Sequence, residues 1–316
     1  MQIFKDLKTM NENNPKNSLK LYGMDEYFDT LYNLNKHKKI PKVLMLSGEK
    51  GSGKFTLINH FLTYLYDLNN YDLKNKTINT ATSFYKSNIN NIFSNIIHLQ
   101  GGSFKKIKIE ELRELKSKLS KSSISNCKRF IILDDVETFN KNSLNALLKI
   151  IEEPSTNDYF ILINNETKKI IETIKSRCFE IKILLSRKQK NEIINNLIKK
   201  HNLESNFDFS LLNLTPGNFL IFNRIFKENE LSLQANYIEN FKKLVNSYQK
   251  NKDLNSINVI LSLTDLYFYK SENSKQPIEK IVENKSFIID NINKLISYNI
   301  NPNNLINAVS SKLVNE

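Results

Sequence analysis

The sequence predicts an α/β domain with a parallel sheet, followed by two helical parts. Short apolar runs alternate with helical patterns up to about residue 184, and beyond it only helical patterns remain. Strands that are apolar on both faces are typical of a parallel sheet covered by helices on each side. We therefore expect three parts, at residues 1–184, 185–225 and 226–316.

Each expected strand or helix follows from the spacing of its apolar residues. An unbroken short apolar run predicts a buried strand, and apolar residues three and four apart predict a helix. The expected strands are 43–46, 96–99, 130–133, 159–163 and 179–183. The expected helices are 24–34, 54–65, 107–121, 143–153, 168–175, 236–249, 256–269, 277–299 and 303–314, with a further small helical group at 187–225. The Asn-rich residues 67–95 predict no definite element, and residues 1–18 predict at most a short helix.

Length and composition limit the class of protein. Two cysteines, Cys127 and Cys178, are too few for a disulfide scaffold or a four-cysteine zinc site, and they predict a reducing compartment. No apolar run approaches the ~18 residues of a membrane span, and the polar N-terminus predicts no signal peptide. We expect a cytoplasmic protein without a membrane partner. The net charge of +13 favours a polyanionic partner, although a lysine-rich composition explains it equally well.

A glycine-rich loop lies between the first expected strand and the next helix. Residues 48–54, GEKGSGK, fit the pattern G-x-x-x-x-G-K, and the loop holds three of the chain's seven glycines. Glycine lets backbone N–H groups turn inward around phosphate oxygens, and the lysine adds a positive charge. The residues expected to bind nucleotide are Gly48, Gly51, Ser52, Gly53, Lys54, Phe55 and Thr56. The alternative is a tight turn without a ligand.

The residue after Lys54 departs from the pattern. A Ser or Thr stands there in the full motif and holds Mg²⁺, whereas this chain has Phe55. Thr56 follows one residue later, about 100° around the helix, so its hydroxyl does not take the same place. Phe55 therefore argues against Mg²⁺-dependent hydrolysis of ATP, whereas binding of the nucleotide is still open.

Two carboxylates follow the expected strand 130–133. Asp134 stands where a Mg²⁺-binding carboxylate is usual. In active ATPases of the type that the chain resembles, described below, the position of Asp135 is normally a Glu that orients the attacking water. Asp is one methylene shorter, and a misplacement of about an ångström can cost ~10²-fold in rate. We expect both at catalytic positions, unless they merely end the strand. Asn164 or Asn165, after the strand 159–163, is a candidate polar sensor near the phosphates, but Asn is so common in this chain that an ordinary loop residue is the favoured interpretation.

Three tracts resemble the bacterial clamp-loader subunits of DNA polymerase III. They are NALLKIIEEP at 145–154, the strand 159–163 and SRC at 176–178, and IETIKSRC is similar to the family's LLPTIRSRC. The resemblance covers most of residues 20–225, weakening through 67–95, and the last stretch is similar to the family's final helices. It implies an AAA+ module with a small lid and a helical collar that oligomerises.

Three departures favour the delta-prime type of this family, whose nucleotide site has decayed. They are Phe55, Asp135 and Asn218, which stands where the family's PGRAL element has an arginine that touches ATP. The motor subunits also carry a four-cysteine zinc module, which this chain lacks the cysteines to form, so no zinc is expected. The four scattered histidines predict no metal site either.

The resemblance also assigns a role to Arg177. It would be an arginine finger that enters a neighbouring subunit's ATP site and neutralises charge on the γ-phosphate. The alternative is an ion pair with Glu152 or Glu172. The neighbouring Cys178 has either a lowered pKa or, as we favour, the role of a small buried apolar residue.

The resemblance implies a clamp-loader subunit that helps load the sliding clamp onto primed DNA. Its partners would be gamma or tau and delta subunits, the clamp, and DNA through backbone contacts. Lys105, Lys106 and Lys108 are candidates for such contacts, and a solvated charge run is as plausible. An active gamma- or tau-type ATPase, another AAA+ DNA-processing ATPase, and an interaction scaffold with an empty loop are the alternatives.

Overall fold

The computed structural model describes residues 15–101, 107–120, 127–271 and 277–314. The chain divides into two compact units. One comprises Met1–Ile193 with Thr215–Gly217, and the other comprises Ile194–Leu214 with Asn218–Glu316. The expected division into three parts at residues 184 and 225 stays a prediction.

The first unit is built on a five-stranded parallel sheet, as the sequence predicts. Its strands are β1 (Val43–Ser47), β2 (Ile96–Gln100), β3 (Arg129–Asp134), β4 (Asp158–Asn164) and β5 (Phe179–Lys182). They lie in the order β2-β3-β4-β1-β5, and every pair is parallel. In β1, Ser47 lies opposite Asn164 of β4 and Lys182 of β5. The carboxyl ends of β1, β3 and β4 therefore meet at one edge, which positions the candidate site.

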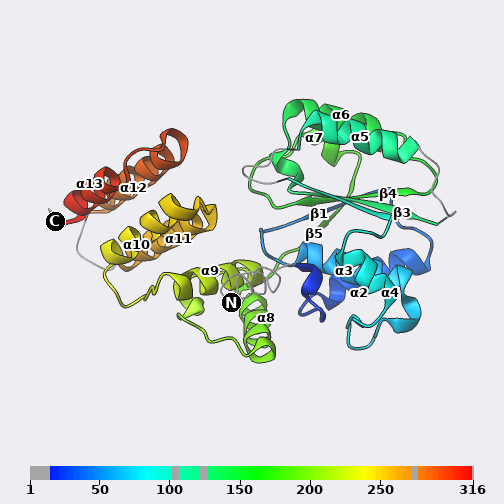
Figure 1. Cartoon of the computed structure of the whole chain (residues 1–316), viewed down its shortest axis with the longest axis horizontal. Helices are drawn as coiled ribbons and strands as arrows, with labels where there is room; N and C mark the ends of the chain where they lie inside the picture. Colours follow the sequence, from blue (N-terminus) through cyan, green and yellow to red (C-terminus); the bar gives the residue numbers. More distant parts are fainter. Residues whose placement is uncertain (1–14, 102–106, 121–126, 272–276, 315–316) are drawn as a thin grey trace. The chain divides into compact units, whose positions relative to one another are not determined.

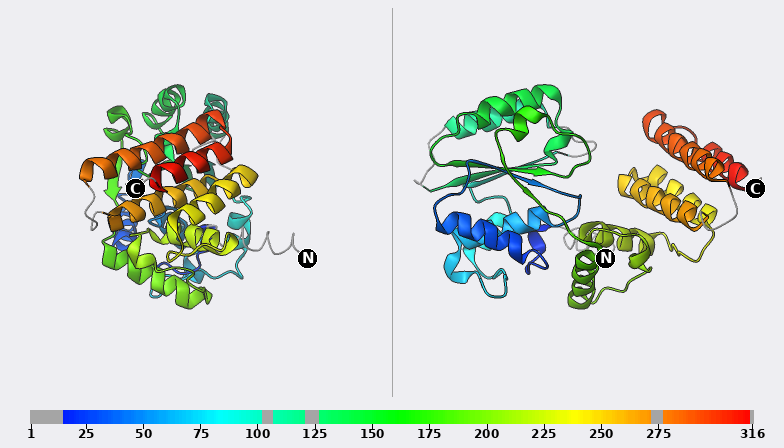
Figure 2. Two further views of the ribbon diagram at one scale, coloured as in Figure 1. Left: turned by 90° about the vertical axis from the view of Figure 1, so that its left-hand side faces the viewer. Right: turned by 180° about the vertical axis from the view of Figure 1, so that it is seen from behind.

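Helices cover both faces of this sheet, and the view from behind shows the same layers (Figures 1 and 2). One face carries α2 (Asp25–Lys36), α3 (Lys54–Tyr66) and α4 (Ser83–Ile89), and the other carries α5 (Ile109–Ser120), α6 (Lys141–Ile151) and α7 (Glu172–Lys175). Alternate strand residues belong to two apolar cores. Leu44 and Ile132 pack into the core with α2 and α3, whereas Met45 and Leu133 pack into the core with α5 and α6. This two-sided burial explains why the strands are apolar throughout.

Side-chain caps fix several helix starts. The Asn140 side chain accepts a hydrogen bond of 2.8 Å from the N–H of Ser143 at the start of α6, and Thr82 caps α4 in the same way. Four short 3₁₀ turns are also described: η1 (Pro15–Asn17), η2 (Leu68–Asn70), η3 (Val136–Thr138) and η4 (Phe209–Leu211). The region 67–95, which predicted no definite element, holds η2 and α4.

One expected helix is shorter than predicted. Residues 168–175 form helix only at Glu172–Lys175. Glu166 adopts a left-handed conformation with φ of 55°, and the Thr167 hydroxyl donates to Glu137. These two features hold the chain after β4 as a loop, which delays the helix.

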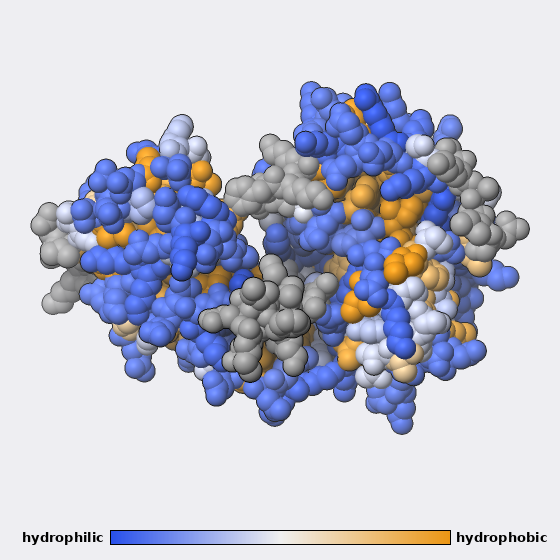
Figure 3. Space-filling view, viewed as in Figure 1, coloured by the Kyte–Doolittle hydropathy of each residue, from blue (hydrophilic) through white to orange (hydrophobic). Residues whose placement is uncertain are grey.

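The second unit is helical, as predicted. Its helices are the end of α8 (Arg187–His201), most of α9 (Pro216–Glu228), α10 (Tyr237–Asn251), α11 (Leu254–Ser271), α12 (Ile278–Tyr298) and α13 (Pro302–Val314). One apolar core runs through this unit, from Ile194 to Leu313. Figure 3 shows hydrophilic residues over most of the displayed surface of each unit. Within the described ranges, no helix is both long and apolar enough to cross a membrane.

Candidate nucleotide site

The glycine loop joins β1 to α3, in the context that the sequence predicts. Gly48 has a φ of 153°, and a Cβ there would lie 2.4 Å from the carbonyl oxygen of Ile183. Gly53 precedes α3 with a left-handed φ of 98°. Only glycine fits both positions without moving the backbone. Among the described residues, no group accepts a hydrogen bond from the N–H of Gly51 or Gly53. Both are therefore available to an anion.

Lys54 is buried inside the loop. Its Nζ donates to the carbonyl oxygens of Gly48 at 2.6 Å and Glu49 at 2.7 Å. Burial lowers its pKa to about 8, and nearby carboxylates, Asp134 first among them, oppose the shift. The ammonium group therefore stays mostly charged at neutral pH, at the place where the sequence predicts contact with phosphate.

The two predicted carboxylates lie at the same end of the sheet but bind different partners. Asp134 is buried, and burial together with the charge of Asp135 raises its pKa to about 6. The Asp135 N–H donates to Asp134 Oδ1 at 2.9 Å. Asp135 Oδ1 accepts from Asn165 Nδ2 at 2.8 Å and lies 3.6 Å from Lys50 Nζ. The carboxylate proposed to orient a water molecule is thus held by two side chains.

The two asparagines after β4 have different roles. Asn164 Nδ2 donates to Ser47 Oγ at 3.2 Å, and Asn164 Oδ1 accepts from the N–H of Glu166 at 3.1 Å. Asn164 therefore ties the ends of β1 and β4 together. Asn165, the other candidate, is the one whose side chain binds Asp135.

Glu137 is a buried carboxylate at this site that sequence reasoning missed. It accepts hydrogen bonds from the Asn165 N–H at 3.1 Å and from Thr167 Oγ1 at 2.8 Å. Its charge also acts on Lys54. The only signal in the sequence was its place shortly after Asp134, which by itself predicts no role.

The residues at the loop fit phosphate better than magnesium. Phe55 occupies the position of the metal-binding hydroxyl, and its ring packs on His98 with centroids 4.7 Å apart. The described residues contain no group of three His, Cys, Asp or Glu side chains arranged to hold a metal ion. Backbone N–H groups and the Lys54 ammonium supply the donors that phosphate oxygens require. We therefore derive no step through a bound magnesium ion.

Residues distant in sequence hold the outer side of the loop within the first unit. Thr215 Oγ1 donates to the carbonyl oxygen of Lys50 at 2.8 Å, and the Gly217 N–H donates to that of Gly51 at 2.9 Å. A Cβ at Gly217 would lie 2.8 Å from Gly51 Cα, so this approach requires glycine. The buried Lys190 ammonium binds Glu49 Oε2 at 2.6 Å. Sequence reasoning identified neither Lys190 nor the Thr215 contact.

Arg177 lies outside this cluster. Its Nη2 donates to Glu152 Oε1 at 2.8 Å, and its Nη1 donates to the carbonyl oxygen of Thr173 at 2.9 Å. The side chain is 38% exposed. The ion pair joins the EEP tract to the SRC tract, so the contact foreseen as the alternative is present. The finger role stays a prediction.

Two further expectations concern residues near these tracts. Cys178 is half-buried and packs against the core with α5 and α6, and burial raises its pKa to about 12, opposite to the lowered pKa that was the other interpretation. Lys108 is exposed at the start of α5. Lys105 and Lys106 lie outside the described residues.

Comparison with known proteins assigns the family. The family model described as "DNA polymerase III, delta subunit" matches residues 23–186, which is more than half of the chain. The chain belongs to this DNA polymerase III family. The match includes the glycine loop, both aspartates and the SRC tract, so the predicted clamp-loader membership is confirmed.

The proteins similar to this chain include both delta' and gamma subunits of DNA polymerase III. DNA polymerase III subunit delta' from Buchnera aphidicola subsp. Baizongia pistaciae is 26% identical over 69% of this chain and 65% of the relative. Subunit gamma from Buchnera aphidicola subsp. Schizaphis graminum is 28% identical over 63% of this chain and 53% of the relative. The chain thus spans less than two thirds of either relative's length. A solved gamma subunit-related protein from Thermotoga maritima is 14% identical with a TM-score of 0.45, covering 89% of this chain and 98% of its own.

Proposed function

We propose that this family member is a delta-prime-type subunit of a DNA polymerase III clamp loader. It would assemble with gamma- or tau-type and delta subunits, and it would help them place the sliding clamp on primed DNA. In this role it hydrolyses little or no ATP itself. It contributes Arg177 to the ATP site of a neighbouring motor subunit.

The observation that carries the proposal is a well-formed phosphate loop followed by Phe55. Gly48, Gly53 and Lys54 keep the conformation of an anion-binding loop, yet the phenyl ring on His98 replaces the hydroxyl that would bind magnesium. Without that ligand the metal that polarises the γ-phosphate is poorly held. The loop then favours binding without efficient turnover.

The state of Asp135 supports the same proposal. Its carboxylate accepts from Asn165 and lies near the Lys50 ammonium. A carboxylate that orients a water molecule must be within hydrogen-bond reach of that water. Asp135 would have to give up these contacts first, in addition to being shorter than Glu.

Arg177 remains able to act on another chain. Its partner Glu152 is 47% exposed, and an exposed ion pair of this kind contributes only about 0–1 kcal/mol to stability. A more strongly negative triphosphate on a neighbouring subunit can therefore replace Glu152 at little cost. An arginine supplied in this way contributes ~10³–10⁵-fold in related phosphoryl transfers.

The test is ATP hydrolysis by the full chain, alone and assembled with motor and delta partners. We expect negligible turnover by the chain alone, and at least a tenfold loss in the assembly on Arg177→Ala, a minimum set well below the ~10³–10⁵-fold effect of arginine fingers. Arg113→Ala, which removes an exposed arginine of α5, is the matched control and should leave turnover unchanged.

Two results would contradict the proposal. Robust magnesium-dependent turnover by the chain alone would instead support an active gamma- or tau-type ATPase. Equal turnover by wild type and Arg177→Ala assemblies would remove the finger assignment. Binding of a fluorescent ATP analogue to the isolated chain separates a nucleotide-binding subunit from a scaffold whose loop stays empty.

A further inference from the structure

A positively charged surface lies at the opposite edge of the sheet from the phosphate loop. It is formed by residues 36–42, which precede β1, by Lys128, which precedes β3, and by Tyr159 near the start of β4. Because the strands are parallel, these segments meet at the edge where the strands begin. We name these residues the amino-edge surface.

The positive charge of the amino-edge surface is not balanced nearby. Residues 30–48 contain no Asp or Glu, although they contain Lys36, Lys38, Lys39 and Lys42. Among the described residues, no carboxylate forms an ion pair with any of these lysines or with Lys128. The buried Asp158 is close to Lys42, but it is bound by Arg129 at 2.7 Å. A lysine-rich composition accounts for the lysines but not for this local lack of acids.

Backbone hydrogen bonds hold the exposed lysines in place. The chain leaves α2 through a fixed turn in which the His37 N–H donates to Asn33 at 3.0 Å and the Lys39 N–H donates to Leu34 at 2.8 Å. Lys38 takes a left-handed φ of 56° in this turn. Three exposed lysines, 36, 38 and 39, therefore project from a defined backbone rather than from a free loop.

The Tyr159 ring holds two more ammonium groups. Lys42 Nζ lies 4.1 Å and Lys128 Nζ lies 5.5 Å from its centroid, and Phe130 stacks on the ring at 5.3 Å. Burial lowers the pKa of Lys42 and of Lys128, and for Lys42 the charge of Asp158 opposes the shift. The Lys42 ammonium also donates to the carbonyl oxygens of Ser155, at 3.2 Å, and Thr156. The ring is already occupied by these neighbours, so we expect no nucleobase to stack on it.

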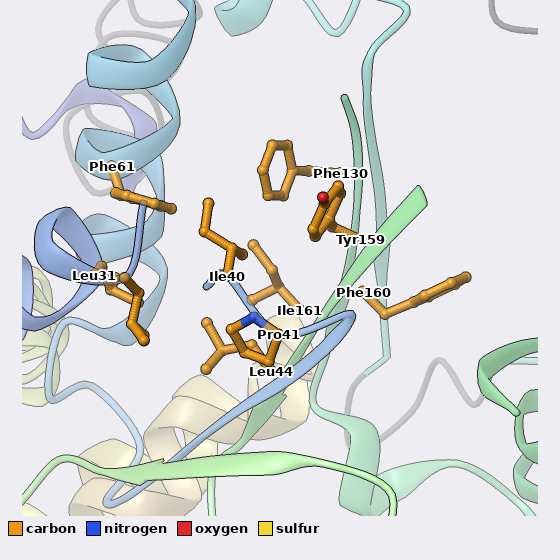
Figure 4. Close-up of a pocket in the computed structure, with 10 residues that line it drawn as sticks. Leu31, Ile40, Pro41, Leu44, Phe61, Phe130, Tyr159, Phe160 and Ile161 are labelled. Atoms are coloured by element: carbon orange, nitrogen blue, oxygen red, sulfur yellow. The ribbon is translucent and has the colours of Figure 1, made fainter. Parts of the chain in front are cut away.

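The shape of the amino-edge surface excludes a peptide that inserts an apolar side chain. The apolar pocket beneath it, rimmed by Ile40, Pro41 and Tyr159 (Figure 4), has a volume of about 10 Å³, room for one water molecule at most. Beside it lies an open hollow of about 420 Å³, lined by Thr30, Asn33, Leu34, His37 and Lys39. Hydroxyl, amide and ammonium donors in an open hollow suit phosphate oxygens.

We propose that the amino-edge surface binds the phosphate backbone of DNA without reading its sequence. Lysines without an ion-pair partner release counterions when they meet closely spaced phosphates, and contacts to phosphate carry no sequence information. The inference does not depend on the nucleotide site or on Arg177. It also places DNA contact on residues other than Lys105, Lys106 and Lys108.

The test is the affinity of the full chain for a fluorescent duplex with a single-stranded extension, measured across a salt series. The variant Lys38→Ser/Lys39→Ser removes two exposed lysines of the surface. The matched control Lys168→Ser/Lys169→Ser removes two exposed lysines after β4, with the same change in net charge. We expect the first variant to bind roughly tenfold more weakly and its salt slope to fall by about 2, and the control to bind like wild type.

Several outcomes would overturn this proposal. They are absence of DNA binding by the wild-type chain, an equal loss in both double variants, and competition by polyglutamate as strong as by unlabelled DNA, which would indicate an acidic protein partner. Thermal unfolding checks that both variants remain folded. ATP turnover of the assembled complex is a separate readout, so failure here leaves the proposed function intact, and the reverse also holds.

Discussion

Each end of strand β3 carries a buried charged residue, and the two residues differ in how fully they are paired. At its start, Arg129 donates from Nε and Nη2 to the two oxygens of Asp158, at 2.7 and 3.0 Å, and Nη2 also donates to the carbonyl of Leu119 at 2.9 Å. At its end, Asp134 is also buried, but the one described group that donates to its carboxylate is the Asp135 N–H. The same strand thus carries a fully paired charge at one edge of the sheet and an underpaired charge at the other.

This difference separates a structural charge from one available for function. The Arg129 pair joins β3, β4 and the end of α5, and all its strong donors are used within the fold. Asp134 has its pKa raised to about 6 by burial and by a neighbouring carboxylate. Strongly perturbed carboxyl groups at the end of a sheet are typical of functional sites.

The largest effect is expected at the paired end. Arg129→Met removes the guanidinium and leaves the Asp158 carboxylate buried without its partner. Breaking a buried pair from one side costs about 3–5 kcal/mol, so the free energy of unfolding measured in urea should fall by that amount. Arg113→Met on the exposed face of α5 is the matched control and should change it by less than about 0.5 kcal/mol. Equal losses in the two variants would show that the pairing at this end is not structural.

A smaller, pH-dependent effect is expected at the underpaired end. The pKa of Asp134 is about 6 in the folded protein against 3.8 when unperturbed, so the folded state binds the proton more tightly. Stability from this group is then fully present below about pH 4 and is lost as pH rises through 6. Asp134→Asn removes the charge, and the variant should be more stable than wild type by roughly 3 kcal/mol at pH 7 and about equal to it near pH 3.

An exposed aspartate gives a control of opposite sign. Hydrogen bonds from Ser210 lower the pKa of Asp208, so its charge favours folding. Asp208→Asn should therefore make the protein slightly less stable at pH 7, and not more stable. If Asp134→Asn also destabilised the protein at pH 7, the ends of β3 would not differ in the way described here.

The sequence predicted the sheet because burial on both faces leaves a strong local pattern. All five strands appear where apolar runs stand, and the glycine loop falls between β1 and α3. The strand order β2-β3-β4-β1-β5 has no such local pattern, since it depends on which distant strands pair. The shortened α7 was missed because the hydrogen bond that delays it runs from Thr167 to an acceptor on another segment, Glu137.

The candidate site was predictable where one short tract contains the chemistry. Gly48, Lys54 and Asp134 stand in motifs with fixed spacing. Lys190 and Thr215 bind loop residues from which they are more than a hundred positions away in the sequence, and only folding brings them together. Asn164 and Asn165 have the same side chain, so the sequence could not show which of them contacts Asp135. That depends on the direction of the turn after β4.

The smallest effect on stability is expected at the exposed pair of Glu152 and Arg177, which sharpens the contrast with Arg129. The two side chains are 47% and 38% exposed, so Glu152→Gln should lower the free energy of unfolding by less than about 1 kcal/mol. The same substitution removes the charged partner of the guanidinium, which keeps its hydrogen bond to the Thr173 carbonyl. If Arg177 acts on a neighbouring ATP site, turnover of the assembled complex should rise about two- to fivefold, because up to about 1 kcal/mol of competing contact is removed.

Glu153→Gln, at the adjacent exposed position, is the control and should change neither the free energy of unfolding nor the turnover. A stability loss as large as that of Arg129→Met, or unchanged turnover, would make Arg177 a structural arginine like Arg129, since both would then serve only to join segments of their own chain.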